Sequence, residues 1–171
     1  MKLTLLIAAV FASVIAGHSQ SLKKYAVSNS GCSLYIYCEP KFDVDYSEDS
    51  SKVFTGECTS DQVTYGLICI KLLTPVSDMD MAEDLVISYL DYLKVSFEII
   101  TAAGYGKGHR MNDNENVRGI IDYWQDKEKA NWKIKAWTDC KFIAVMYAKS
   151  KKELPETKVS VFLNGFRFQG M

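Results

Sequence analysis

Apolar residues recur at helical spacing between residues 80 and 104. Asp80 and Glu83 form a capping-box arrangement at the start of this stretch, and Gly104 is a residue type at which helices commonly end. The apolar positions that share one helical face are Ala82, Leu85, Val86, Tyr89, Leu90, Leu93, Phe97 and Ile100. We therefore predict one long amphipathic helix that ends at Gly104.

The remaining patterned segments alternate between apolar and polar residues, which is typical of strands. They are residues 33–39 and 41–47, a hairpin over 52–73 that turns near Ser60 and Asp61, and three segments at 116–126, 131–137 and 140–149. Short polar connections make the last three antiparallel neighbours. Pro155 is a residue type found at helix starts, and the apolar spacing after it predicts a short C-terminal helix.

Two amphipathic helices and an antiparallel sheet predict an α+β sandwich that forms a single domain. The segments "SLYIYCEPKFDV", "GLICIKL", "AEDLVISYLDYLK", "GIIDYW", "KIKAW", "FIAVMYA" and "FLNGFRF" follow one another in an order that resembles the PsbP-like fold. A photosystem II accessory protein, a small Ran-binding nuclear protein and various bacterial envelope proteins share this fold. The resemblance implies an antiparallel sheet covered by helices and a non-catalytic binding role, and it supplies no site residue.

The N-terminus has the organisation of a secretory signal peptide. Lys2 precedes an apolar run over residues 3–16 that is short for a bilayer span, and small residues follow it. We predict a signal peptide at residues 1–19 and a domain at 20–171. The protein is then secreted or periplasmic, with no integral membrane segment after cleavage.

Export permits disulfides among the five cysteines. Cys32 and Cys38 are too far apart along one strand to bond, and the predicted hairpin places Cys58 opposite Val63, which disfavours a bridge from Cys58 to Cys69. The pairing otherwise stays open. No spacing of cysteine and histidine suits zinc, so we expect neither a metal nor another cofactor.

The net charge of the whole chain is −1, and 12% of its residues are aromatic. A nucleic acid or an anionic membrane requires a basic footprint, so we expect no nucleic-acid partner. A protein or a glycan is the expected partner.

The stretch "AAGYGKGHR", residues 102–110, is the predicted ligand-binding connector. Its glycines are spaced G-x-G-x-G after a helix, whereas a dinucleotide fingerprint needs G-x-G-x-x-G after a strand. One interpretation is a helix end followed by a plain connector. The other is a binding loop that presents Tyr105, Lys107, His109 and Arg110.

Two tryptophans, Trp124 and Trp137, complete the predicted ligand-binding set. Alternation places Trp137 on one face with Lys133 and Lys135, and places Trp124 with Arg118. If both faces of the sheet are covered, these rings belong to the core. If one face is open, they form an aromatic, cationic surface for a protein or glycan.

We predict a non-catalytic binding or accessory protein, because no catalytic motif is assembled in the sequence. One alternative is a hydrolase of carbohydrate or peptide that uses His109 or the pair Asp122 and Asp126, since tryptophans flank these carboxylates. Another alternative is a structural subunit of an envelope assembly. The acidic segment 43–49 lacks the glycine and the closing glutamate of a calcium loop and is predicted to be a solvated turn.

Overall fold

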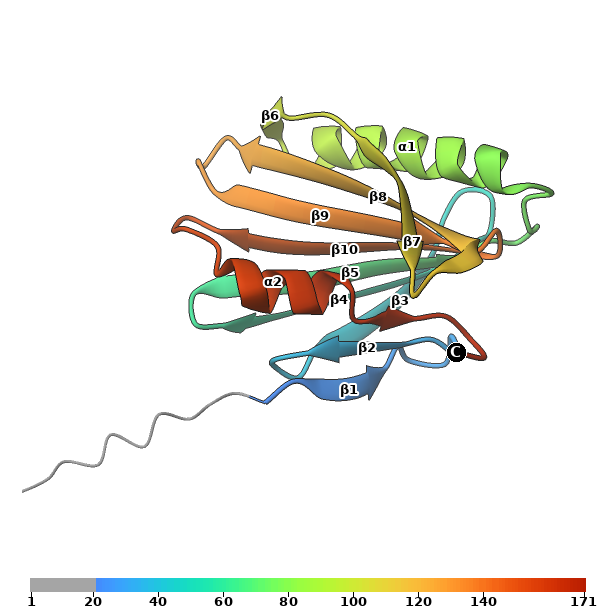
Figure 1. Cartoon of the computed structure of the whole chain (residues 1–171), viewed down its shortest axis with the longest axis horizontal. Coiled ribbons are helices and arrows are strands. Elements are labelled where there is room, and N and C mark those ends of the chain that lie inside the picture. Colours follow the sequence, from blue (N-terminus) through green and yellow to red (C-terminus); the bar gives the residue numbers. More distant parts are fainter. Residues whose placement is uncertain (1–20) are drawn as a thin grey trace, which may run out of the picture.

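Antiparallel hairpins build a large sheet of eight strands in the computed structural model, which describes residues 21–171 (Figure 1). In spatial order the large sheet contains β3 (Lys41–Tyr46), β4 (Lys52–Ser60), β5 (Val63–Lys71), β10 (Phe142–Ser150), β9 (Asn131–Thr138), β8 (Asn114–Asp126) and β6 (Ile99–Ala102), with β7 (Gly106–Met111) also paired to β8. A small sheet contains β1 (Lys23–Ala26), β2 (Ser33–Ile36) and β11 (Phe166–Arg167). The predicted signal peptide lies outside the described residues.

The two faces of the large sheet contact different elements. Helix α1 (Met79–Ser96) packs against β8, β9 and β6 on what we call the half-covered face. Helix α2 (Glu156–Leu163) packs against β10 and β9 on the opposite, covered face, where the small sheet joins the same apolar core (Figure 1). Within residues 21–171, no helix is long and apolar enough to cross a membrane.

The predicted fold class, an α+β sandwich with helices covering one antiparallel sheet, is wrong. Strands make up 49% of the described residues and helices 17%, and a second sheet forms part of the covering layer, so the fold is a β-rich sandwich. Strands β1, β6, β7 and β11 were not predicted. Each has two to six residues, which is too short for a clear alternation, and their pairing depends on partners elsewhere in the chain.

The long helix is confirmed, but its predicted ends are wrong. Asp78, not Asp80, caps the N-terminus by accepting a hydrogen bond from the Met81 N–H at 2.8 Å. The helix ends at Ser96, eight residues before Gly104. The β-branched run after Glu98 pairs with β8 as strand β6. Pairing with a distant strand therefore outweighs the helical spacing that predicted these residues to be part of the helix.

Two glycines let large aromatic side chains lie flat across neighbouring strands. Gly66 on β5 is opposite Tyr147 on β10, and Gly119 on β8 is opposite Trp137 on β9. A Cβ atom at either glycine would overlap the ring of its partner. The three central strands predicted at 116–126, 131–137 and 140–149 are confirmed as antiparallel neighbours.

A disulfide between Cys38 and Cys58 joins the chain after β2 to strand β4 of the large sheet. The hairpin turns at Asp61 and Gln62, both with positive φ, one residue later than predicted. Cys58 is consequently opposite Tyr65 and not Val63.

Candidate functional site

Helix α1 leaves part of the half-covered face open to solvent. Strand β4 shows this most directly, because its residues alternate in exposure. Phe54 and Gly56 are buried on the covered face, whereas Thr55, Glu57 and Thr59 are exposed on the half-covered face. Strand β10, at the centre of the sheet, is buried on both sides from Phe142 to Ala148. On this face, the sheet is therefore open where α1 ends.

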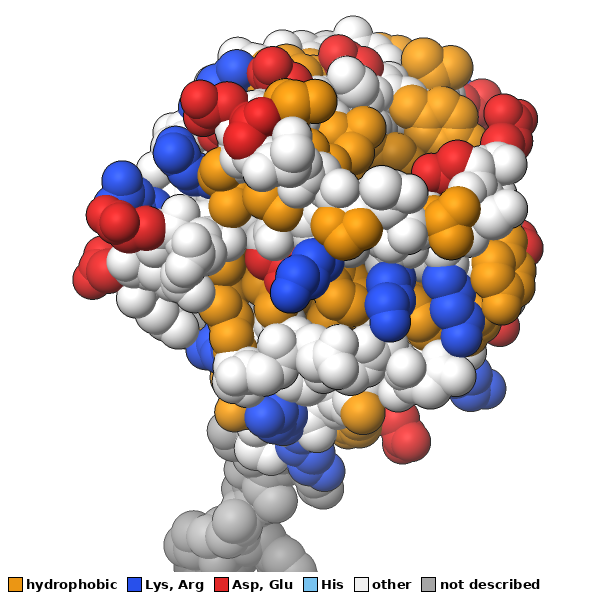
Figure 2. All heavy atoms as spheres, turned by 90° about the vertical axis from the view of Figure 1, so that its right-hand side faces the viewer, with side chains coloured by type: hydrophobic (Ala, Val, Ile, Leu, Met, Phe, Trp, Pro, Cys, Tyr) orange, Lys and Arg blue, Asp and Glu red, His pale blue; other side chains and the backbone are white. Residues whose placement is uncertain are grey.

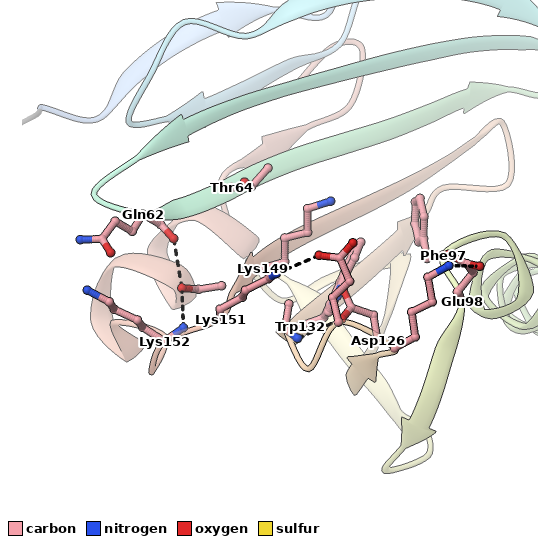
Figure 3. Close-up of a pocket in the computed structure, with 13 residues that line it drawn as sticks. Gln62, Thr64, Phe97, Glu98, Asp126, Trp132, Lys149, Lys151 and Lys152 are labelled. Atoms are coloured by element: carbon pink, nitrogen blue, oxygen red, sulfur yellow. Dashed lines mark hydrogen bonds and ion pairs between the residues drawn. The ribbon is translucent and has the colours of Figure 1, made fainter.

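A pocket of about 440 Å³ lies at this place, and we call it the end pocket (Figure 3). Its walls come from the β4–β5 turn, the C-terminal end of α1, the β8–β9 turn and the end of β10. The lining residues are Gln62, Thr64, Phe97, Glu98, Asp126, Lys127, Glu128, Ala130, Trp132, Lys149, Ser150, Lys151 and Lys152. Its volume falls in the range of small-molecule sites.

Two stacked aromatic rings, Phe97 and Trp132, line the end pocket, and Tyr147 packs against both from outside its lining. Phe97 stacks on Trp132 with ring centroids 4.9 Å apart, and Tyr147 lies 5.7 Å from Phe97 and 5.2 Å from Trp132. The Lys149 ammonium lies 4.5 Å from the Trp132 ring centroid, a cation–π distance. This wall joins an apolar surface to a positive charge.

Asp126 is fixed inside the end pocket. Its carboxylate accepts hydrogen bonds at 2.9 Å from Trp132 Nε1 and from the Ala130 N–H. Burial alone raises the pKa of Asp126, but these hydrogen bonds and the nearby Lys149 charge outweigh it, so the pKa lies below its usual value. The carboxylate is therefore ionised at neutral pH and serves as an acceptor.

The lysines of the end pocket differ in how they are neutralised. Lys127 pairs with Glu98, and Lys151 pairs with Glu128 at 2.9 Å. Lys149 lies 3.8 Å from Glu57, which is outside the pocket. No carboxylate of the described chain lies within ion-pair distance of Lys152. Because four lysines and three carboxylates line the pocket, one positive charge is in excess.

A second hollow of about 450 Å³ continues from Phe97 over the open part of the half-covered face. We call it the face hollow. Phe97 lines both hollows, and the Tyr147 hydroxyl donates a hydrogen bond to Glu57 beside it. Burial first, and the Glu57 carboxylate second, raise the pKa of Tyr147. The tyrosine thus stays protonated and holds Glu57 between the two hollows.

None of the six residues predicted to bind a ligand lines the end pocket, and two of them are packed beneath α1. The Lys94 ammonium lies 4.2 Å from the Tyr105 ring centroid and 5.8 Å from that of Trp124. It also lies 3.2 Å from Asp91 and 3.3 Å from the fully buried Asp122. Burial lowers the pKa of Lys94, but the tyrosine hydroxyl and the two carboxylates more than offset this and raise it. The network ties α1 to the sheet.

Three other residues of the predicted ligand-binding set, Lys107, His109 and Arg110, lie on strand β7. They are not part of a loop that follows the helix, as the sequence had suggested. Lys107 is 3.9 Å from Asp84 of α1, and Arg110 is 3.2 Å from Glu115 across its hairpin. His109 is partly buried, and burial and then the Lys135 charge lower its pKa. Gly104 does have a positive φ of 93°, but it connects β6 to β7 instead of ending a helix.

The aromatic, cationic surface considered for Trp124 and Trp137 does not form. The two rings are 3% and 1% exposed and lie on opposite faces of the large sheet. The Lys135 ammonium lies 4.4 Å from the Trp137 ring centroid and donates to Asn164 Oδ1 at 2.8 Å. Both tryptophans are core residues, as predicted for a sheet covered on both sides.

The acid pair considered for a hydrolase is held apart by the strand. Asp122 and Asp126 are four residues apart on β8, a separation of about 13 Å along the strand, whereas a glycosidase pair lies about 5–9.5 Å apart. Each carboxylate accepts a hydrogen bond from a tryptophan Nε1. Among residues 21–171, no group of three histidine, cysteine, aspartate or glutamate side chains could hold a metal ion.

The opposite end of the large sheet, where β5 ends and β10 begins, carries charge without a comparable hollow. Figure 2 shows a row of Lys and Arg side chains there with hydrophobic side chains between them. Lys52, Lys71 and Phe142 are opposite one another on neighbouring strands. The Lys52 ammonium lies 5.2 Å from the Phe54 ring centroid, and the Lys71 ammonium lies 5.9 Å from the Phe142 ring centroid. These lysines cover aromatic core residues.

The sequence contained a signal for the end pocket that we did not use. Lysines cluster at 149–152 directly after a strand, and the acidic and basic residues at 126–129 occupy a neighbouring strand connection. Antiparallel pairing of β9 with both β8 and β10 brings these two segments to one end of the sheet. The chain matches no protein-family model and no curated protein sequence, so this geometry is what any functional assignment rests on.

Proposed function

We propose that this is an exported, non-catalytic binding protein that holds a small carboxylate-bearing ligand in the end pocket. The observation that carries the proposal is the aromatic wall beside an excess lysine charge, in a hollow of ligand size. The Lys149 and Lys152 ammonium groups would bind the carboxylate. Phe97 would contact the apolar or pyranose face of the ligand, and Asp126 would accept its hydroxyl or amide hydrogens.

A binding role fits the pocket better than a catalytic one. Its one serine, Ser150, donates its hydroxyl hydrogen to the Gln62 carbonyl oxygen and accepts from the Lys152 N–H, both at 3.0 Å (Figure 3). A serine nucleophile instead needs a general base as its hydrogen-bond partner. Neither histidine nor cysteine lines the pocket.

Export to an oxidising compartment is supported by the Cys38–Cys58 disulfide together with the predicted signal peptide. The ligand carboxylate could belong to an acidic sugar or to a peptide. Both sources present the same group to the lysines, and the test below separates them.

Calorimetric titration of the 20–171 protein with glucuronate, N-acetylneuraminate, an acidic dipeptide and neutral glucose tests the proposal. We expect one acidic class to bind and glucose not to bind. Lys149→Met, which keeps an aliphatic chain over Trp132, should weaken binding about tenfold through the lost charge.

Lys23→Met is the matched control, because Lys23 is exposed on β1 of the small sheet and should leave binding unchanged. If no acidic probe binds, or if both methionine variants weaken binding equally, the proposed site is wrong.

A further inference from the structure

Two of the cysteines outside the Cys38–Cys58 disulfide are buried side by side. Cys32, just before β2, is 2% exposed, and Cys69 on β5 is not exposed at all. Both are free thiols in the apolar core of the covered face, and each shifts the pKa of the other, so the two groups are neighbours there. The third, Cys140, lies partly exposed in the β9–β10 turn.

The chain after β2 lies beside β5 near these thiols. The rings of Tyr37 and Tyr65 are 5.6 Å apart, which places the two segments side by side at this point. From there Cys32 is five residues back and Cys69 is four residues on, which are similar lengths of about 16 and 13 Å of extended chain. The Cys38–Cys58 disulfide adjoins this point, because Cys38 follows Tyr37 and Cys58 is paired with Tyr65.

The backbone around Cys32 is also fixed. Its carbonyl oxygen accepts from the Val27 N–H at 2.9 Å, and its own N–H donates to Ser30 Oγ at 3.0 Å. The Gln169 side chain packs against Gly31 next to it. Local contacts therefore fix the backbone that carries the Cys32 thiol.

We propose that Cys32 and Cys69 form a second disulfide, which links the small sheet to the large sheet through the core. The bond adds a second covalent link between the two layers, beside the Cys38–Cys58 disulfide. It leaves Cys140 as the single thiol of the described chain.

The bond forms by exchange with an external disulfide such as oxidised glutathione. One of the two cysteine thiolates attacks one sulfur of that disulfide, which forms a mixed disulfide and releases one thiolate. The other cysteine thiol then loses its proton and displaces the second thiolate, so two electrons pass to the oxidant. Because both cysteines are buried in the folded protein, exchange takes place before the core closes.

The test is refolding of the reduced 20–171 protein in a glutathione redox buffer, followed by alkylation in denaturant and peptide mass mapping. We expect label on Cys140 alone and a peptide pair cross-linked between Cys32 and Cys69. Label on Cys32 and Cys69, or a cross-link from either one to Cys140, would overturn the proposal.

Two variants keep the test interpretable if refolding is incomplete. Cys140→Ser removes the third thiol and should yield no label at all, whereas Cys69→Ala should yield label on both Cys32 and Cys140. Complete reduction should lower the melting temperature of Cys140→Ser by several degrees. The same treatment should lower the melting temperature of Cys69→Ala/Cys140→Ser by less, because this double variant has one disulfide to lose and Cys140→Ser has two. Equal losses in the two proteins would count against the second disulfide.

Discussion

The two faces of the large sheet are covered to different extents, and this difference locates the hollows. On the covered face, α2 and the small sheet bury aromatic residues such as Phe162 and Trp137 almost completely. On the half-covered face, α1 packs mainly against β8, β9 and β6, and Phe97 at its C-terminal end lines both the end pocket and the face hollow. On this face, the end of one helix determines where the sheet stays open.

The comparison predicts that equal truncations on the two faces have unequal effects. Phe162→Ala on α2 removes a fully buried ring and should lower the free energy of unfolding by about 3–5 kcal/mol. Phe97→Ala removes a partly exposed ring and should cost about 1–2 kcal/mol. Urea denaturation of both variants measures the difference, and equal costs would mean that the half-covered face is as closed as the other.

The glycine–aromatic pairs provide a second, smaller contrast. Gly119→Ala places a methyl group against Trp137 in the closed core, and we expect a loss of about 2–3 kcal/mol in unfolding free energy. Gly66→Ala displaces Tyr147, which can tilt toward the face hollow, so a loss of about 1–2 kcal/mol is expected. Gly119→Ala should therefore have the lower melting temperature of the two variants. The reverse order would contradict the conclusion that the half-covered face is the more open one.

The smallest expected effect is a pH dependence at Asp126. Its pKa is lowered on folding, so its contribution is fully present above the unfolded pKa of about 3.9 and is lost as the pH falls through the lower folded value. Asp126→Asn should therefore melt below the wild type at pH 6, and the gap should close as the pH falls below about 4.

Melting curves from pH 6 down to pH 3 measure this gap. Asp43→Asn on the exposed edge strand β3 is the control, because its carboxylate has no hydrogen bond to a tryptophan. A gap at Asp126 that does not change with pH would show that the lost hydrogen-bond geometry, and not the charge, is responsible.

Local sequence patterns predicted the elements with long repeats but not the short ones. The helix over Ala82 to Leu93 and the alternating strands β5, β8, β9 and β10 were found because each repeats its pattern several times. The fold class was wrong because β1, β2 and β11 form a second sheet. Residues 166–167 pair with residues 33–34, more than 130 positions away, and two residues contain no readable period.

The sequence pointed to a different candidate site for a related reason. The prediction followed glycine spacing to Tyr105, His109 and their neighbours, which lie beside α1 or on β7. The end pocket instead combines four separate chain segments, each an ordinary polar turn or helix end when considered alone. Nothing local in such a segment indicates that Trp132 and Lys149 meet there.

The sequence by itself determined the apolar faces of the central strands and most of that of α1, because side-chain periodicity is a local property of the backbone. Leu85 of the predicted helical face is exposed. The sequence also determined which cysteines could not pair within one strand. Only the tertiary structure decided that Ile99 to Ala102 leave the helix to pair with β8, that Trp124 and Trp137 lie on opposite faces, and that α1 stops short of the sheet's end. These outcomes depend on burial against distant partners, and the free energy of that burial outweighs local propensity.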